Sequence, residues 1–437
     1  PLGRVGGRGC RRRGGGRGRE VTPEDLQRLV KKETPSALAE SLARLSEKER
    51  RALSKTAAAL HRKHSRGELW SEASRQRWLG VFEAAPTTQS FWRVAVYVGL
   101  AVLGVGPLSL ARRLEFIHHD LHDPEADPVV RVLADRRPPW ASDWLEHRLE
   151  QEWPGLSWGT ARLLVTHGVC GRPKSTGYAR LMAREMRLVP RPGQQPHVPL
   201  SRRLLQDPGL LEDEVWRLFE CDTDAFSFDW MAGAQHVPEG YETWPDALLR
   251  LCGDETLDRA RLLDASLSGL WITTNSATQS GLSAFHQRLE PTPDELHARE
   301  GAYCELLGHK TPPVVGVALR QLARLQKASG IDAARFLEAA RPVFALKPKA
   351  HPLTVLRLLR RLVAGPDVLP AEAVALLVEA FRHPAVDVQE TALALLEKNE
   401  GALDDTARAG LAESLEDVAL LVRPRVARLL GAEAIAT

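Results

Sequence analysis

The sequence has 437 residues, of which 43% are hydrophobic and 26% are charged, values typical of a soluble protein that buries a large core. Its five Cys residues are scattered and form no CxxC motif, which argues against a disulfide framework or a Cys-rich zinc site and suits a reducing cytoplasm. The net charge is +3, but residues 1–20 contain seven Arg and one Glu, so that residues 21–437 carry −3. The basic character therefore belongs to the N-terminal tail, and we expect a cytoplasmic protein.

The tail at residues 1–20 is almost entirely Gly and Arg, and we predict that it is disordered because it cannot bury a core. An Arg/Gly segment could bind RNA or another polyanion. We favour the simpler interpretation that it lies outside the true domain, as a translated leader or an expression remnant, because the sequence begins without Met.

Helices are predicted from Thr22 onward. Thr22 can cap a helix, Pro23 suits the first helical position, and Asp25 lies in the first turn. Apolar residues then recur at helical spacing, with no strand-like alternation of useful length. We assign residues 21–188 to an irregular helical N-terminal region that is rich in Trp.

An uncharged segment at residues 94–110 invites comparison with a membrane span. Its 17 residues are at the short end of the roughly 17–25 needed to cross a bilayer. Three Gly and Pro107 interrupt it, and charged helical sequence flanks it. We therefore predict a helix that is buried on all faces in a soluble protein.

The sequence HHDLHD at residues 118–123 is the one cluster that resembles a metal site. His118 and His122 are four residues apart and would share a helix face, with Asp120 or Asp123 nearby. No further ligand is indicated elsewhere, so we interpret the cluster as a solvated helix end and predict no metal site.

A Pro-rich connector at residues 189–200 separates the N-terminal region from a central helical region at 201–310. Within the latter, residues 219–230 combine closely spaced acids with alternating aromatics. We predict an extended segment that its aromatic side chains pin against neighbouring helices, with the acids at its exposed start. Paired carboxylates could instead serve acid–base chemistry or hold a cation, but no nucleophile or pocket can be assigned beside them.

The segment that begins at Thr292 has clear helical signals. Thr292 and Glu295 predict a capping box with Pro at the first helical position. Arg299 lies four residues after Glu295 and is predicted to pair with it along the helix. Tyr303 continues the same face. These residues are explained by structure without invoking catalysis.

Residues 311–437 show a repeating pattern of helix pairs. First helices are predicted from Pro312, Pro352 and Pro384, and each is followed by a partner helix, from residues 331, 369 and 403. A final first-type helix is predicted from Asp417. The apolar stripes are regular and are formed by Val355, Leu358, Leu359 and Leu362 in one helix and by Val374, Leu377, Val378 and Phe381 in another.

A helix pair of this length cannot bury its stripe alone, so neighbouring pairs must stack. The pattern resembles HEAT-type repeats. The predicted fold class is therefore all-α, an α-α superhelix (a HEAT-like α-solenoid) with an irregular, Trp-rich helical N-terminal half.

A more specific resemblance rests on residues 244–270 and 289–315, together with 136–144 and 158–182. This sequence resembles an uncharacterised bacterial helical-repeat family whose members are often encoded near SWIM-type zinc-finger proteins and predicted ATPases. The resemblance covers most of residues 22–431 and implies a fold and a genomic context, but no mechanism. The matching positions include Arg259, Arg261, Leu262, Leu263, Asp264, Pro291, Thr292, Glu295, Arg299, Tyr303 and Leu307.

Charge is distributed unevenly over the predicted repeats. The first-type helices contain ten basic and four acidic residues, and the second-type helices reverse this balance. A basic surface could meet DNA, RNA or an acidic protein, although we expect these charges to pair with acids of adjacent repeats or with a protein partner. The candidate interaction face consists of Arg320, Arg324, Arg357, Arg360 and Arg361.

Motifs that carry chemistry are missing from the sequence. It contains no GxxxxGK[ST], HExxH, GxSxG or EF-hand motif, and no GxGxxG after a strand. We therefore expect a non-enzymatic scaffold that mediates protein–protein interactions in a bacterial multi-component system, without a cofactor, with a SWIM-type zinc-finger protein or an ATPase as the partner that the resemblance implies. The alternative is a HEAT-like nucleic-acid-binding protein or a DNA glycosylase.

Overall fold

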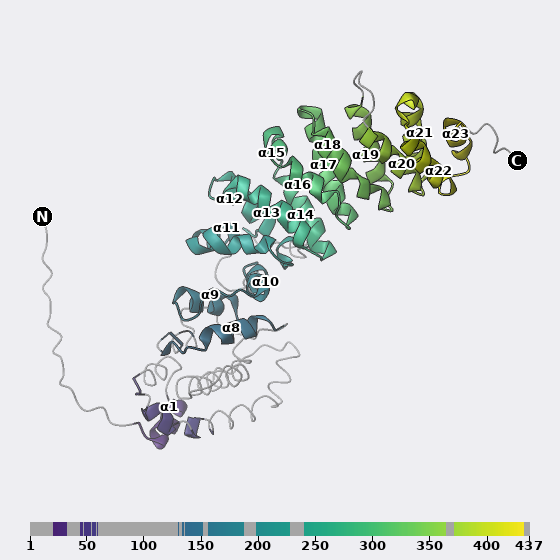
Figure 1. Ribbon diagram of the computed structural model, residues 1–437. Coiled ribbons are helices and arrows are strands. Elements are labelled where there is room, and N and C mark those ends of the chain that lie inside the picture. Colours follow the sequence, from purple (N-terminus) through teal and green to yellow (C-terminus); the bar gives the residue numbers. More distant parts are fainter. Residues whose placement is uncertain are drawn as a thin grey trace, which may run out of the picture. The chain divides into compact units, whose positions relative to one another are not determined.

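The computed structural model describes residues 21–32, most of 44–59, parts of 130–136, and then 137–151, 156–187, 198–227, 240–363 and 371–431. All regular elements in these ranges are helices, and no strand occurs among them, which confirms the all-α fold class for this part of the chain (Figure 1). The chain divides into two compact units, residues 1–181 and 182–437.

Some predictions concern residues outside these ranges. They are the Gly/Arg tail at 1–20, the uncharged segment 94–110, the His/Asp cluster 118–123 and most of the connector 189–200. In the part of the chain that the structure does describe, no helix is long and apolar enough to cross a membrane.

The first unit contains short helices joined by polar and backbone contacts. The carboxylate of Glu146 accepts hydrogen bonds from the backbone N–H groups of Lys174 (2.5 Å) and Ser175 (3.0 Å). A Cβ atom at Gly177 would lie 1.8 Å from the carbonyl oxygen of Leu149, so the helices that contain these two residues pack backbone against backbone. The elements are α1 (Pro23–Lys32), α8 (Ala141–Leu149), α9 (Trp158–Thr166) and α10 (Thr176–Glu185), which runs on into the second unit.

The predicted start of α1 is confirmed. The backbone N–H of Asp25 donates to Thr22 Oγ1 (3.1 Å), while the N–H of Thr22 donates to the Asp25 carboxylate (3.2 Å). Pro23 occupies the first helical position, where its missing N–H costs no helical hydrogen bond.

The second unit begins with short helices that pack around an aromatic cluster. The rings of Phe219 and Phe285 lie 4.9 Å and 5.2 Å from that of Phe226. The elements are α11 (Leu200–Leu205), η2 (Leu210–Glu214), η3 (Val215–Phe219), η4 (Asp224–Phe226), α12 (Trp244–Gly253), α13 (Arg259–Ile272) and α14 (Ser276–Arg288).

The aromatic contacts of η4 confirm that this segment is pinned against its neighbours, but the predicted extended conformation is wrong for residues 224–226, which form a 3-10 turn. The Thr223 side chain accepts from the backbone N–H of Ala225 and so starts the turn. A Cβ atom at Gly281 would lie 1.5 Å from the carbonyl oxygen of Phe226, so α14 can meet this turn only through glycine. Phe228 and Trp230 lie outside the described residues.

The remainder of the second unit consists of helices and single 3-10 turns. They are α15 (Pro293–Ala298), α16 (Glu300–Leu306), α17 (Pro312–Ala328), α18 (Ala333–Ala340), η5 (Arg341–Ala345), α19 (Ala350–Leu362), α20 (Ala371–Glu379), η6 (Ala380–Arg382), α21 (Val386–Lys398), η7 (Glu400–Ala402), α22 (Asp405–Glu413), η8 (Ser414–Glu416) and α23 (Arg423–Leu429).

The helix starts differ in detail from the prediction. Of the three first helices that were predicted to start with proline in the repeats, α17 alone begins at that proline. Pro352 is the third residue of α19, and Pro384 lies two residues before α21. The last helix begins at Arg423 instead of Asp417, because Pro424 suits a first turn and the preceding residues form turns.

Successive helices of the second unit pack in two rows (Figure 1). In one row α14 contacts α17, α17 contacts α19, and α19 contacts α21. In the other row α13 contacts α16, α16 contacts α18, α18 contacts α20, and α20 contacts α22. We call these the α14–α21 row and the α13–α22 row. The core lies between them, where the predicted stripe residues Val355, Leu359, Leu377 and Phe381 are fully buried.

Candidate functional site

The candidate interaction face lies on two helices that contact each other. Arg320 and Arg324 are one turn apart on α17, and Arg357, Arg360 and Arg361 lie in the second half of α19. All five side chains are exposed. The structure therefore places the five predicted residues on adjacent helices of the α14–α21 row, and we call them the basic face.

The basic face does not form the expected salt bridges with described residues. Arg320 donates to the Gln287 side chain, and Arg324 donates to the Pro291 carbonyl oxygen (3.0 Å). Arg357 contacts only its own helix, at Thr354 Oγ1 (2.7 Å). Each of these partners is neutral, so no described acid pairs with these guanidinium groups.

Salt bridges do join other helices in this part of the second unit. Lys349 pairs with Asp387 at 2.7 Å, and Arg425 pairs with Glu397. The expected pairing with an acid of an adjacent repeat is therefore confirmed for Arg425, whereas no described acid pairs with the basic face. The reason lies in the sequence, because α14, α17 and α19 contain seven Arg or Lys residues and no Asp or Glu.

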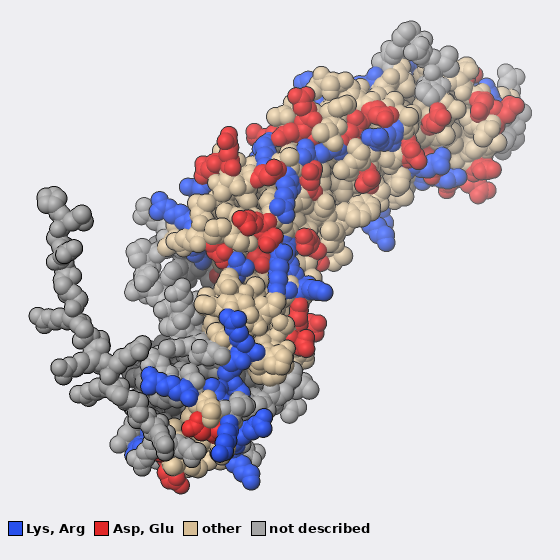
Figure 2. Space-filling view, turned by 60° about the vertical axis from the view of Figure 1, so that its left-hand side comes forward, with Lys and Arg blue, Asp and Glu red and all other residues tan. Residues whose placement is uncertain are grey.

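The basic character belongs to particular helices. On the side of the second unit shown in Figure 2, Lys and Arg side chains are interspersed with Asp and Glu side chains. A same-sign surface therefore depends on the local run of three helices without acids, and not on the net charge of the unit.

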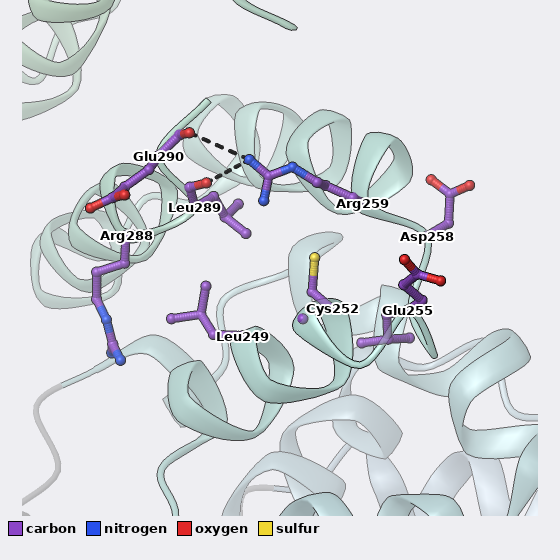
Figure 3. Close-up of a pocket in the computed structure, with 10 residues that line it drawn as sticks. Leu249, Cys252, Glu255, Asp258, Arg259, Arg288, Leu289 and Glu290 are labelled. Atoms are coloured by element: carbon purple, nitrogen blue, oxygen red, sulfur yellow. Dashed lines mark hydrogen bonds between the residues drawn. The ribbon is translucent and has the colours of Figure 1, made fainter. Parts of the chain in front are cut away.

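A cleft of about 840 Å³ lies where α12 and α14 end and α13 begins (Figure 3). Its apolar lining comes from Leu249, Leu257 and Leu289, beside the thiol of Cys252. Sequence reasoning did not predict this cleft, because it forms between helix ends that are 35 residues apart in the chain, at Glu255 and Glu290.

Two arginines of the cleft are already paired. Arg259 forms a bidentate pair with Glu295 (2.7 Å and 3.0 Å) and donates to the carbonyl oxygen of Leu289 (2.7 Å). Arg288 pairs with Asp246 at 2.6 Å. The hydrogen bond from Arg259 is the largest cause that holds the pKa of Glu295 below its ordinary value.

The carboxylates at the cleft are less engaged. Asp258 accepts from the backbone N–H of Arg261 (2.6 Å) as the N-cap of α13. The carboxylates of Glu255 and Glu290 form no ion pair or hydrogen bond with any described residue. Both residues have positive φ values, 57° and 46°, where the chain reverses after α12 and α14.

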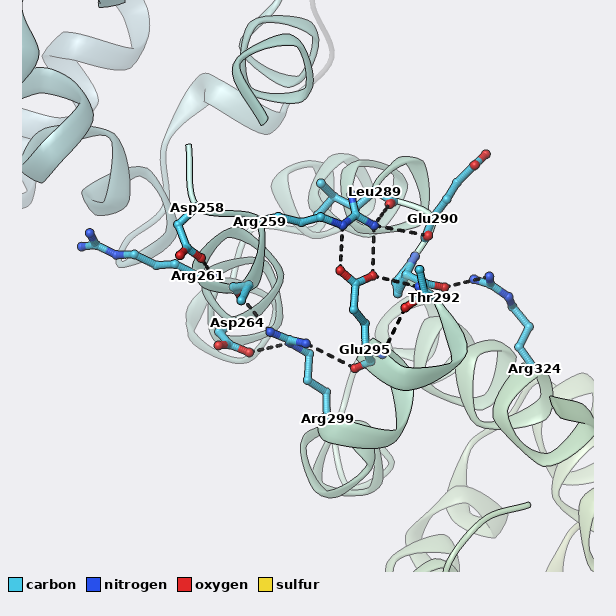
Figure 4. A network of polar contacts seen from close by, with 12 residues as sticks. Asp258, Arg259, Arg261, Asp264, Leu289, Glu290, Thr292, Glu295, Arg299 and Arg324 are labelled. Atoms are coloured by element: carbon cyan, nitrogen blue, oxygen red, sulfur yellow. Dashed lines mark hydrogen bonds and ion pairs between the residues drawn. The ribbon is translucent and has the colours of Figure 1, made fainter. Parts of the chain in front are cut away.

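A polar network connects the cleft to the next helices (Figure 4). Glu295, which binds Arg259, also accepts from the backbone N–H of Thr292 (2.8 Å), and the N–H of Glu295 donates to Thr292 Oγ1 (3.3 Å). The predicted capping box is therefore confirmed. Many residues that carry the family resemblance join α13 to α15 here, which favours a structural role for them.

The predicted pairing of Arg299 with the Glu295 carboxylate is wrong. Arg299 instead donates to the Asp264 carboxylate (2.6 Å) and to the carbonyl oxygens of Ala260 (2.9 Å) and Glu295 (3.3 Å). α15 ends at Ala298, so Arg299 leaves the helix and reaches α13. Helical spacing predicted that Arg299 lies near Glu295, but not that α15 ends before Arg299.

A hydrogen-bonded chain of three side chains is buried between α13, α14 and α16. Ser266 Oγ lies 2.7 Å from His286 Nδ1, and His286 Nε2 lies 2.9 Å from the Tyr303 hydroxyl. A Ser–His contact can activate a nucleophile, but all three side chains are fully buried and none lines the cleft. Burial lowers the pKa of His286 to about 4, so the ring is neutral. We therefore interpret these three hydrogen-bonded side chains as structural.

The acids of residues 219–230 also have structural partners. Asp222 accepts from the Thr273 and Thr274 hydroxyl groups and from the backbone N–H of Thr274 (3.1 Å), which fixes the turn between α13 and α14. Burial alone would raise the pKa of Asp222, but these hydrogen bonds lower it below its ordinary value. Asp224 pairs instead with Arg187 at 3.5 Å, so the two acids do not form one site.

Comparison with known proteins identifies the family. Residues 20–350 match the family described as Domain of unknown function (DUF6493), and this range covers most of the chain.

The chain belongs to this family. The matched range includes the cleft, the polar network and the first part of the basic face on α17, while most of α19 and all later helices lie beyond residue 350. No curated protein and no solved structure matches the chain.

Proposed function

We propose that this DUF6493 protein is a non-enzymatic scaffold that binds an acidic segment of a partner protein through its basic face. The observation that carries the proposal is the run of three neighbouring helices without a single acid, on which none of the five exposed arginines pairs with a described acid. Uncompensated charges of one sign attract and orient a partner of opposite charge.

The two rows of helices support a HEAT-like α-solenoid as the form of this scaffold. From α13 to α22 and from α14 to α21, each helix of a row contacts the next helix of that row, as stacked repeats do. Such an array presents successive helices of one row side by side, so an extended partner segment can contact α17 and α19 together. We further propose a bacterial multi-component system as the setting, with a SWIM-type zinc-finger protein or an ATPase as the partner.

A protein segment fits better than nucleic acid because, on the side of the second unit shown in Figure 2, Lys and Arg side chains are interspersed with Asp and Glu side chains. A phosphate backbone would meet these acids over a longer surface. For a DNA glycosylase, an aromatic side chain is needed to hold the extruded base. The described cleft has leucines, a cysteine and charged residues in its lining, and no aromatic residue.

The test measures binding of labelled peptides and oligonucleotides to a chain that begins at Val21, so that the Arg/Gly tail cannot bind polyanions by itself. We expect a Glu-rich peptide to bind, and an Arg357→Glu/Arg361→Glu variant to lose about tenfold in affinity. An Arg335→Glu/Arg341→Glu variant is the control, because it makes the same charge change on exposed residues of α18 and of η5, the turn that follows it.

Tighter binding of duplex or single-stranded oligonucleotides than of the Glu-rich peptide, with a steep loss of affinity as salt increases, would contradict a protein partner. Equal affinities of the two charge-reversed variants would show that the basic face is not the binding surface. A pulldown from the native host, analysed by mass spectrometry, then names the partner.

A further inference from the structure

The cleft adjoins the basic face. The end of α14 lines the cleft with Arg288, Leu289 and Glu290, while Arg320 and Arg324 bond to the residues on either side of that stretch, Gln287 and Pro291. A partner segment that crosses the basic face toward the end of α14 therefore reaches the mouth of the cleft within a few residues.

The charge of the cleft is opposite to that of the basic face. Arg259 and Arg288 are neutralised by Glu295 and Asp246, whereas the Glu255 and Glu290 carboxylates have no described partner. The C-terminal ends of α12 and α14 also lie at the cleft and add negative partial charge, while the Asp258 carboxylate caps the positive end of α13 there. The cleft therefore favours a cation.

The apolar lining of the cleft indicates which kind of cation fits there. Leu257 and Leu289 line the cleft and are almost fully buried, and Leu249 and Cys252 line it as well. A side chain with a long aliphatic stem and a terminal charge can bury its methylene groups there and leave the charge among the carboxylates at the rim. Lysine and arginine have this form.

We propose that the cleft binds a Lys or Arg side chain of the same partner segment, next to the acidic stretch that the basic face binds. This inference rests on the proposed function and adds a second, oppositely charged anchor to it. The partner segment is then a charged sequence with a fixed order, in which one basic residue follows or precedes an acidic run. Such an order gives specificity that a simple attraction between opposite charges does not.

The experiment uses the full chain and five labelled peptides of equal length. One is a Glu-rich run flanked by neutral residues, two have a Lys at one end of the run or at the other, and two have norleucine in place of that Lys. We expect the better Lys peptide to bind about fivefold more tightly than its norleucine counterpart. A Glu255→Gln/Glu290→Gln variant should lose this advantage.

The control is Glu372→Gln/Glu413→Gln, which removes the same two charges from exposed residues of α20 and α22. The Arg/Gly tail contributes equally to all variants, and circular dichroism checks that they remain folded. The inference is supported if the Lys advantage disappears only in the Glu255/Glu290 variant. It is overturned if Lys gives no advantage, or if both variants keep it.

These outcomes separate the two proposals. If the norleucine peptide binds through the basic face but Lys adds nothing, the scaffold proposal stands and the cleft proposal fails. If Lys adds affinity while charge reversal on α19 has no effect, the cleft is the binding site and the basic face is not. If no peptide binds, both proposals fail.

Discussion

In residues 259–307, polar side chains join one helix to the next: Arg259 to Glu295, Arg299 to Asp264, and His286 to both of its hydroxyl neighbours. In residues 312–431, buried apolar stripes join one helix to the next, and the ion pairs between neighbouring helices lie near the surface. Both regions belong to the second unit and consist of helices packed in rows. We call residues 259–307 the polar region and residues 312–431 the apolar region.

The comparison shows how packing and polar contacts divide their roles. Apolar stripes repeat along the chain and allow any similar helix pair to stack, which suits an extendable array. A directional polar network fixes one particular arrangement, because each donor needs its own acceptor. The polar region also shapes the cleft, so the more specific packing coincides with the more specific candidate site.

The largest expected effect tests the apolar region. Replacing the fully buried Leu393 of α21 by Ala should lower the free energy of unfolding by about 3–4 kcal/mol, because it removes buried methyl groups and leaves a cavity. Chemical denaturation followed by circular dichroism measures the change. Leu420→Ala is the matched control, since that side chain is 78% exposed and should lose almost nothing. Similar losses at both positions would contradict the assigned core.

A second effect is specific to the polar region and depends on pH. Burial lowers the pKa of His286 from 6.5 to about 4. Between these values the unfolded chain binds a proton that the folded chain does not, so stability falls as the pH decreases from 6.5 toward 4, by roughly 3 kcal/mol. Above pH 6.5 this contribution is constant.

The measurement compares the pH dependence of unfolding for the wild type and for a His286→Gln variant. The variant should be less stable at neutral pH, yet its stability should decline less steeply in the acidic range. Comparing the slopes cancels the contributions of the carboxylates and of the other histidines to the pH dependence, because both proteins contain them. Parallel curves would mean that His286 titrates normally in the folded state.

The smallest effect compares ion pairs of the two regions by double-mutant cycles. Arg259→Met and Glu295→Gln should show a coupling of about 1 kcal/mol, because the pair is bidentate but still partly exposed to screening solvent. Lys349→Met and Asp387→Asn should show no measurable coupling, since that pair is exposed. Equal couplings would mean that the polar network adds no specific stability.

The sequence predicted the apolar region better than the polar one. Helical spacing identified the buried stripes of α19 and α20, because periodicity follows directly from helix geometry. It placed Arg299 beside Glu295 but missed the end of α15 at Ala298, which sends the guanidinium group to Asp264. Local spacing says nothing about partners that are 35 residues away in the chain.

The candidate sites show the same limit. The five arginines of the basic face were identified from charge counts on predicted helices, and the lack of nearby acids on α14 could have been read from its sequence. The cleft could not be predicted from the sequence, because it depends on how the ends of α12 and α14 meet. Glu255 and Glu290 look like ordinary surface residues in the sequence; only their positive φ values and shared position at helix ends distinguish them.

The close approach of α14 to the turn at η4 has a consequence for how related sequences diverge. Since a Cβ atom at Gly281 would overlap the backbone of Phe226, a relative can replace that glycine only if the η4 segment is shifted, shortened or lost. The two sites should therefore change together over evolution, although they are separated by the whole of α12 and α13. In a future alignment of the family, the residue at position 281 would sort members that keep the aromatic turn from members that have rebuilt it.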